Sequence, residues 1–104
     1  MKTKLIICGL FCLLAARSVK AADNKVGIDL YESGMIGAAK AFFLDNLKQQ
    51  REGVLQAETC YYLGECYLVS GLRDSAGVYY QKGIEFMPDD SYNRIGLVGL
   101  KLGK

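Results

Sequence analysis

The sequence predicts an all-α fold made of helical hairpins, because one strong hairpin pattern recurs in part before and after itself. Over Ala57–Pro88, small and apolar residues recur at helical spacing on both sides of a break at Ser70-Gly71. This pattern is typical of two short amphipathic helices that face each other across a tight turn. Gly64 and Ala76 are small where the helices would cross, so the two backbones can approach closely.

This stretch resembles one tetratricopeptide (TPR) repeat, a helical hairpin of about 34 residues. The family pattern is Trp-x2-Leu-Gly-x2-Tyr, then Ala-x3-Phe, then Pro. The outright matches are Leu63, Gly64, Tyr67, Ala76 and Pro88, with Tyr80 in the place of Phe and Cys60 in the place of Trp. The resemblance implies TPR-like α/α hairpin repeats that form a short right-handed solenoid. It also implies a non-catalytic scaffold or adaptor that binds other proteins.

The pattern returns more weakly on both sides of this hairpin. Gly34 and Ala39 precede Gly71 and Ala76 by 37 residues, and Gly96 lies where the last helix would repeat Gly64. We therefore expect a repeat domain over 22–104 with about two and a half repeats, at 24–53, 57–90 and 91–104. Its helices should lie near residues 24–33, 36–50, 54–70, 73–86 and 90–102.

Polar residues mark where these helices begin and where the chain turns. Asp23 or Asn24 can cap the first helix. Residues 89–91 can begin the last helix, where acidic groups also complement the helix dipole. Residues 51–53, which end in Gly53, are expected to form the loop between the first two hairpins.

Residues 1–21 have the pattern of a secretory signal peptide. A basic start is followed by an apolar run over Leu5–Ala16, and Val19 and Ala21 are the small residues that precede a cleavage site. The run is too short to span a bilayer comfortably. We therefore expect export to the periplasm or cell envelope, with membrane contact only through this segment before cleavage. A retained amphipathic anchor is the alternative.

Composition excludes several classes of function. Four of the 13 basic residues and none of the 11 acidic ones lie in the signal segment, so residues 22–104 carry a net charge of −2 and no nucleic-acid partner is indicated. The absence of histidine excludes Ser-His and Cys-His nucleophiles and histidine metal sites. The sequence thus predicts neither an enzyme nor a cofactor or metal site.

Two cysteines, Cys60 and Cys66, remain after the signal segment. On one helix they are about 9 Å apart along the axis, at ~1.5 Å per residue, and point in different directions, so they cannot pair with each other. We expect both to be small apolar fillers of the core, and an intermolecular disulfide is the alternative.

The candidate binding surface is the face of each first helix that lines the concave groove, as the TPR resemblance implies. By matching positions, its residues are Asn24, Ile28, Tyr31, Glu32, Glu58, Tyr61, Glu65, Leu68, Val69, Asn93, Leu97 and Leu100. This mixture of aromatic, aliphatic and acidic groups suits a protein or peptide ligand, either extended or helical. For residues such as Tyr61 and Leu68, packing between neighbouring first helices is the alternative.

The last helix is apolar nearly all round. Its apolar residues are Ile95, Leu97, Val98, Leu100 and Leu102. A closing helix normally has a polar outer face. The sequence therefore leaves two interpretations. Either this helix meets another surface, which includes self-association, or the chain is the N-terminal repeat segment of a larger envelope protein whose catalytic or sensory domain lies beyond residue 104.

Overall fold

The fold is that of a computed structural model, which describes residues 23–103. These residues form five α-helices with no strand among them. The helices are α2 (Lys25–Glu32), α3 (Ile36–Gln49), α4 (Gly53–Val69), α5 (Arg73–Phe86) and α6 (Ser91–Lys101). The prediction of an all-α fold with five helices in these places is confirmed. The expected signal segment, residues 1–21, lies outside the described residues.

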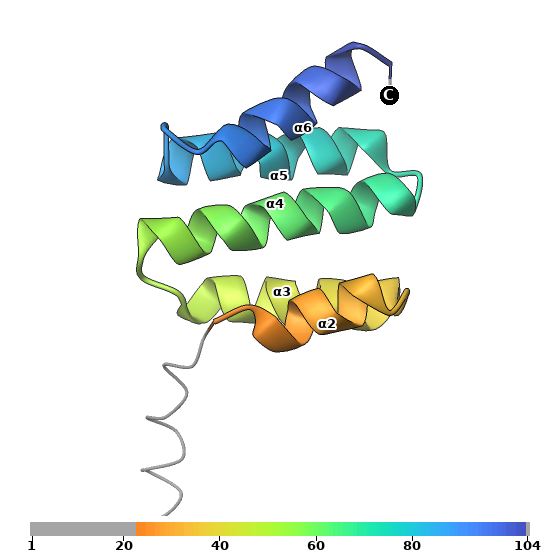
Figure 1. The fold of residues 1–104 in the computed structure, drawn as a ribbon, viewed down its shortest axis with the longest axis vertical. Coiled ribbons are helices and arrows are strands. Elements are labelled where there is room, and N and C mark those ends of the chain that lie inside the picture. The colour runs from red at the N-terminus through yellow and green to blue at the C-terminus, as the bar shows by residue number, and fades with distance from the viewer. Residues whose placement is uncertain (1–22, 104) are drawn as a thin grey trace, which may run out of the picture.

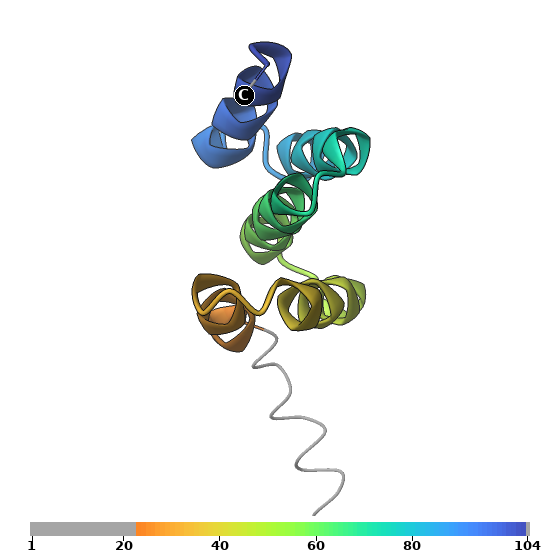
Figure 2. The ribbon, with the colours of Figure 1, turned by 90° about the vertical axis from the view of Figure 1, so that its right-hand side faces the viewer.

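The helices follow one another along the long axis of the molecule (Figure 1). Seen from the side, α2, α4 and α6 form one column, in which α4 is set back toward the other helices, and α3 and α5 form a second column beside it (Figure 2). Each helix packs on its neighbours in sequence, and α4 also contacts α2 and α6. The first column therefore presents one continuous face.

Both hairpin turns have the same backbone conformation. Gly34 and Gly71 have φ angles of 84° and 82°, a left-handed region that glycine adopts without steric cost. In the second turn the Leu72 N–H donates to the Tyr67 carbonyl at 2.8 Å, and the equivalent bond closes the first turn at 2.9 Å. This bond is typical of a Schellman helix end. The 37-residue spacing of the two glycines thus corresponds to a repeated turn.

Each helix of the first column brings a glycine against a buried aromatic ring. A Cβ atom added to Gly27 would lie 2.5 Å from the Phe43 ring, and one added to Gly64 would lie 2.5 Å from the Tyr80 ring. A Cβ on Gly96 would meet that same Tyr80 ring at 2.5 Å. The tyrosine ring is therefore held between α4 and α6, and the expectation that Gly64 lies at a close helix crossing is confirmed.

The rest of the core is small and tightly packed. Ala39, Phe43, Leu63 and Cys66 form one buried cluster between α3 and α4. Cys60 is also fully buried, and both cysteines are free thiols. Burial raises the pKa of Cys60 to about 12 and that of Cys66 to about 11. Both cysteines therefore pack as neutral, apolar groups, as expected.

The expectation that Gly53 lies in a connecting loop is wrong. Gly53 is the first residue of α4, which begins after Glu52. A Cβ atom on Gly53 would lie 3.0 Å from the carbonyl oxygen of Phe86. The end of α5 approaches the start of α4 here, and the missing side chain leaves room for its backbone.

The last helix covers α5 with one side and leaves another side open. Leu97 and Leu100 are half-buried. Ile95, Val98 and Leu102 are 66%, 53% and 71% exposed. These three exposed side chains line a shallow apolar hollow on the outer side of the helix.

Candidate binding groove

A buried polar cluster joins α2, α3 and α4 at one end of the first-column face. Asn24 is only 1% exposed, and its Nδ2 donates to Glu58 Oε1 at 2.8 Å. Its Oδ1 accepts from Thr59 Oγ1 at 2.9 Å, from Asn46 Nδ2 at 3.1 Å and from Gln50 Nε2 at 3.2 Å. The side chain of Asn24 therefore neither caps α2 nor lies open in a groove. It ties three helices together.

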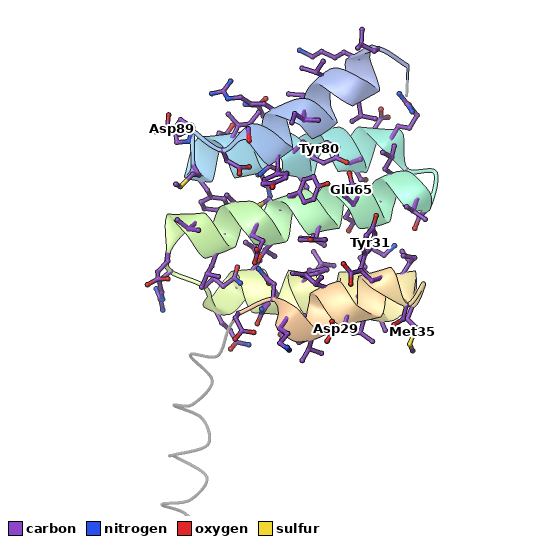
Figure 3. All side chains as sticks on the ribbon, in the orientation of Figure 1. Asp29, Tyr31, Met35, Glu65, Tyr80 and Asp89 are labelled. Carbon is purple, nitrogen blue, oxygen red and sulfur yellow. The ribbon has the colours of Figure 1, made fainter. Side chains whose placement is uncertain are left out.

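A second polar link crosses the same face further along α4. Glu65 accepts a hydrogen bond from Tyr31 of α2 at 3.3 Å and another from Tyr80 of α5 at 2.5 Å (Figure 3). Burial, with the nearby Glu65 carboxylate, raises the pKa of Tyr31 to about 12, and burial with the Glu65 hydrogen bond raises that of Tyr80. Both phenols stay protonated at neutral pH and donate to Glu65.

Aromatic rings run from this link toward α6. The Tyr62 ring packs edge-on against Tyr31 at 5.7 Å and stacks on Phe43 at 5.6 Å. The Tyr61 ring lies 5.1 Å from Tyr62 and 5.6 Å from Tyr92. Burial raises the pKa of Tyr61 and of Tyr62. Between α2 and α4 the face is thus filled by the chain's own side chains, while the rings continue toward α6.

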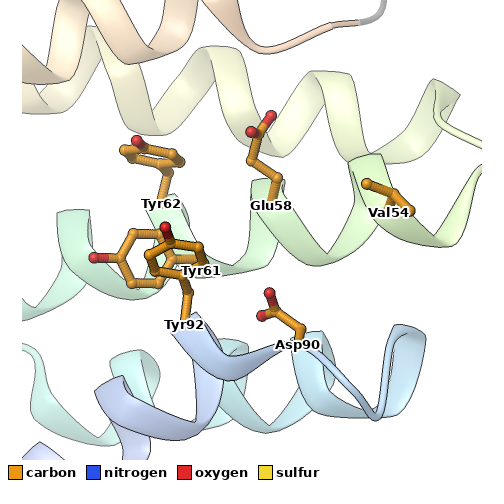
Figure 4. Close-up of a pocket in the computed structure, with 6 residues that line it drawn as sticks. All are labelled: Val54, Glu58, Tyr61, Tyr62, Asp90 and Tyr92. Atoms are coloured by element: carbon orange, nitrogen blue, oxygen red, sulfur yellow. The ribbon is translucent and has the colours of Figure 1, made fainter.

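Between α4 and α6 the face opens into a hollow of about 380 Å³ (Figure 4). Aromatic, acidic and aliphatic side chains line it: Val54, Glu58, Tyr61, Tyr62, Asp90 and Tyr92. Val54 and Tyr92 stand at its edge, 62% and 63% exposed. The volume lies in the range of ligand pockets, roughly 300–1,000 Å³.

Each carboxylate of the hollow uses one oxygen for the fold. Glu58 Oε1 accepts from Asn24. Asp90 Oδ2 accepts from the backbone N–H of Asn93 at 3.0 Å and from its side-chain amide at 2.6 Å, and so caps α6 as expected. Within residues 23–103, nothing hydrogen-bonds to Glu58 Oε2 or Asp90 Oδ1, and no basic side chain pairs with either group.

The structure brings together only some of the residues that the sequence predicted for the groove. Glu58 and Tyr61 line the hollow. Tyr31 and Glu65 lie on the same face but bond to each other. The others on α2 and α4 are half-buried or exposed: Ile28 packs against the core, Leu68 is half-buried, and Glu32 and Val69 are exposed.

The predicted residues of α6 lie elsewhere. Asn93 is fully buried, and its side-chain amide donates to the Ala57 carbonyl at 3.0 Å. Leu97 lines a separate hollow between α5 and α6. Leu100 approaches α5, 3.6 Å from where Gly77 would carry a Cβ atom. These three side chains therefore hold α6 in place and do not line the hollow described above.

Four residues of the hollow were missed from the sequence: Val54, Tyr62, Asp90 and Tyr92. The match of Gly96 to Gly64 puts Tyr92 at the position of Cys60, which is fully buried, yet Tyr92 is 63% exposed. Cys60 lies on α4, which packs against α5, the partner helix of its hairpin, whereas no helix follows α6 within residues 23–103. Tyr92 therefore has no partner helix of its own hairpin to cover it there, and its ring lies at the hollow.

Comparison of the chain with protein-family models, with curated proteins and with solved structures finds no match. In the described part of the chain, no group of three or more metal-ligating side chains is placed to hold a metal ion. None of the helices from α2 to α6 has the length and apolar character needed to cross a bilayer.

Proposed function

We propose that this chain is a non-catalytic protein–protein interaction module, a TPR-like scaffold or adaptor exported to the bacterial periplasm or cell envelope. Its helical hairpins would form a short right-handed solenoid, and its partner would bind on the face of α2, α4 and α6. The partner is a protein or peptide, and the hollow between α4 and α6 is the centre of the contact.

The repeated hairpin geometry supports the TPR-like part of this proposal. Gly34 and Gly71 turn the chain in the same way, and Gly27 and Gly64 each meet a buried aromatic ring of their own hairpin. Helical repeats of this kind use an extended face as a binding surface. Export is supported by the pattern of residues 1–21 alone.

The proposal of a binding function rests on one observation, the hollow lined by Tyr61, Tyr62 and Tyr92. Tyrosine is enriched in the central contacts of protein interfaces, because it supplies a large apolar ring with a hydroxyl group at its edge. The exposed ring of Tyr92 is not needed to fill the core. A partner that covers these rings would remove apolar surface from water.

A larger envelope protein that begins with these repeats is the second candidate. Gly103 favours it, because its φ angle of 80° repeats the conformation that turns the chain at Gly34 and Gly71. A following helix would pack against the exposed side of α6, where Ile95 and Val98 lie. A reading frame that continues past Lys104 into another domain would support this candidate.

A photo-crosslinking experiment tests the binding function. The full chain carries benzoylphenylalanine at Tyr92 in the hollow or, as a control, at Val78 on α5, which is 52% exposed. We expect a discrete protein adduct in the envelope fraction from position 92 and none from position 78. Adducts from both positions, or from neither, would contradict a partner on this face. The intact mass of the same protein tests cleavage after Ala21.

A further inference from the structure

We infer that the hollow between α4 and α6 takes a lysine or arginine side chain from an extended segment of the partner. This inference rests on the proposed binding function and adds the chemistry of the partner. It is supported by the residues that line the hollow, by the charge of its walls and by the lysines that lie over two other tyrosine rings of the chain.

The walls combine rings with carboxylates in one place. Tyr61 and Tyr92 lie 5.6 Å apart, and Tyr61 and Tyr62 lie 5.1 Å apart, all three along one side of the hollow. Glu58 on α4 and Asp90 at the start of α6 complete the lining (Figure 4). The long apolar stem of a lysine or arginine packs on rings while its charged end reaches acidic groups.

The charge of the hollow is negative and uncompensated. Glu58 and Asp90 are its charged lining residues, and no lysine or arginine lines it. One oxygen of each carboxylate has no hydrogen-bond partner among residues 23–103. Tyr61 and Tyr62 stay neutral, because burial raises their pKa values. A cationic group is therefore the occupant whose charge complements these walls.

Elsewhere the chain covers two of its tyrosine rings with its own cations. Lys40 Nζ lies 4.9 Å from the centre of the Tyr67 ring, and Lys82 Nζ lies 5.1 Å from the centre of the Tyr79 ring. These two rings stack on each other at 5.4 Å, between α4 and α5. In the described chain no such cation lies over the rings of the hollow. The partner would place a cation against the rings of the hollow, as Lys40 and Lys82 do against Tyr67 and Tyr79.

Titration with three blocked peptides tests the inference. In the first peptide lysine alternates with serine, and in its two matched versions glutamine or glutamate replaces lysine. Binding to the full chain is followed by amide chemical shifts and by calorimetry. We expect the lysine peptide to bind best, with its largest shifts at residues 58–62 and 90–92 and with weaker binding at higher salt. Equal binding of the glutamine peptide would show that charge is not recognised and would overturn the inference.

Two nearly isosteric variants test the carboxylates. Glu58→Gln still accepts from Asn24, and Asp90→Asn still caps α6, so both should fold. We expect each to weaken lysine-peptide binding roughly two- to fivefold, the range for a partly exposed ion pair. The matched control changes, Glu85→Gln and Asp74→Asn, are at the hollow between α5 and α6. If the control variants lose as much affinity for the lysine peptide, the effect comes from the net charge of the protein and not from the hollow, and the inference is overturned.

A third variant does not depend on charge. Tyr92→Leu removes an exposed ring, and we expect it to weaken binding of the lysine peptide as well. Unchanged affinity would contradict the role of the rings. The outcomes also separate this inference from the proposed function. A partner adduct at position 92 without preference for the lysine peptide overturns the inference alone, and the absence of any adduct overturns both.

Discussion

The close approach of Gly64 to Tyr80 makes Gly64→Ala a sharp test of the packing. The new Cβ atom would lie 2.5 Å, 2.7 Å and 2.9 Å from the Cε1, Cδ1 and Cζ atoms of the ring. The ring has no room to move away, because Tyr80 is fully buried, its hydroxyl bonds to Glu65, and Gly96 approaches the same ring. One methyl group must therefore push α4 away from α5.

The magnitude follows from two opposing effects. Replacing glycine by alanine inside a helix stabilises it by roughly 0.5–1 kcal/mol. Overpacking a full core costs about 1–3 kcal/mol. Gly99 is the matched control, since it also lies inside a helix but nothing is within 4 Å of its added Cβ atom. We expect Gly64→Ala to be less stable than Gly99→Ala by about 1–3 kcal/mol, because the packing cost is the difference between them. In a domain of this size that is a gap of several degrees or more in Tm.

Urea unfolding followed by circular dichroism measures this difference. Gly53 is not a neutral control, since its added Cβ atom would lie 3.0 Å from the Phe86 carbonyl oxygen. A double-mutant cycle with Tyr80→Leu adds a second check, because the penalty of Gly64→Ala should shrink once the ring is gone. If Gly64→Ala and Gly99→Ala unfold at the same urea concentration, the contact between Gly64 and Tyr80 is refuted.

Three further predictions concern buried polar and ionisable groups. In the folded state the pKa of Tyr31 is raised to about 12, that of Cys60 to about 12 and that of Cys66 to about 11. Because the native state holds these protons more tightly, the contribution of these three groups to stability should be constant below pH ~9 and be lost as the pH rises toward ~12, as thermal melts between pH ~8 and ~12 would reveal. Both thiols should react with a thiol reagent at neutral pH only as fast as the protein opens, and a fast native reaction would contradict their burial. Asn24→Leu should cost about 1–3 kcal/mol, because it leaves buried polar partners without their hydrogen bonds, whereas Glu32→Ala, at an exposed position, should change stability by less than ~0.5 kcal/mol.

The hairpins could be predicted from the sequence because their signals are local. A glycine at a left-handed turn and a small residue at a helix crossing are required by the backbone itself, and Gly71 and Gly64 fulfil these requirements within one hairpin. The repetition at Gly34 needed only the spacing of 37 residues. Such signals can be recognised in a single sequence, because their meaning does not depend on residues that are distant along the chain.

The hollow could not be predicted in full, because it depends on which side of α6 packs against the central hairpin. The repeat pattern places Gly96 at the position of Gly64, but it does not tell which aromatic ring Gly96 meets. The structure places it on Tyr80, so Tyr92 faces the hollow and Asn93 is buried. Asn24 is a similar case. Its burial depends on polar partners from α3 and α4, which the pattern of its own helix does not reveal.

The ring of Tyr80 has a consequence for the motions of the molecule. A buried aromatic ring rotates only when its neighbours move apart for a moment, and here the neighbours are the backbones of two helices that belong to successive hairpins. Repeat proteins generally open one unit at a time, with each unit stabilised by its nearest neighbours. A ring shared in this way joins α6 to the central hairpin, so we expect α6 not to open independently of that hairpin. The flipping rate of one tyrosine would thus report how often both contacts open together.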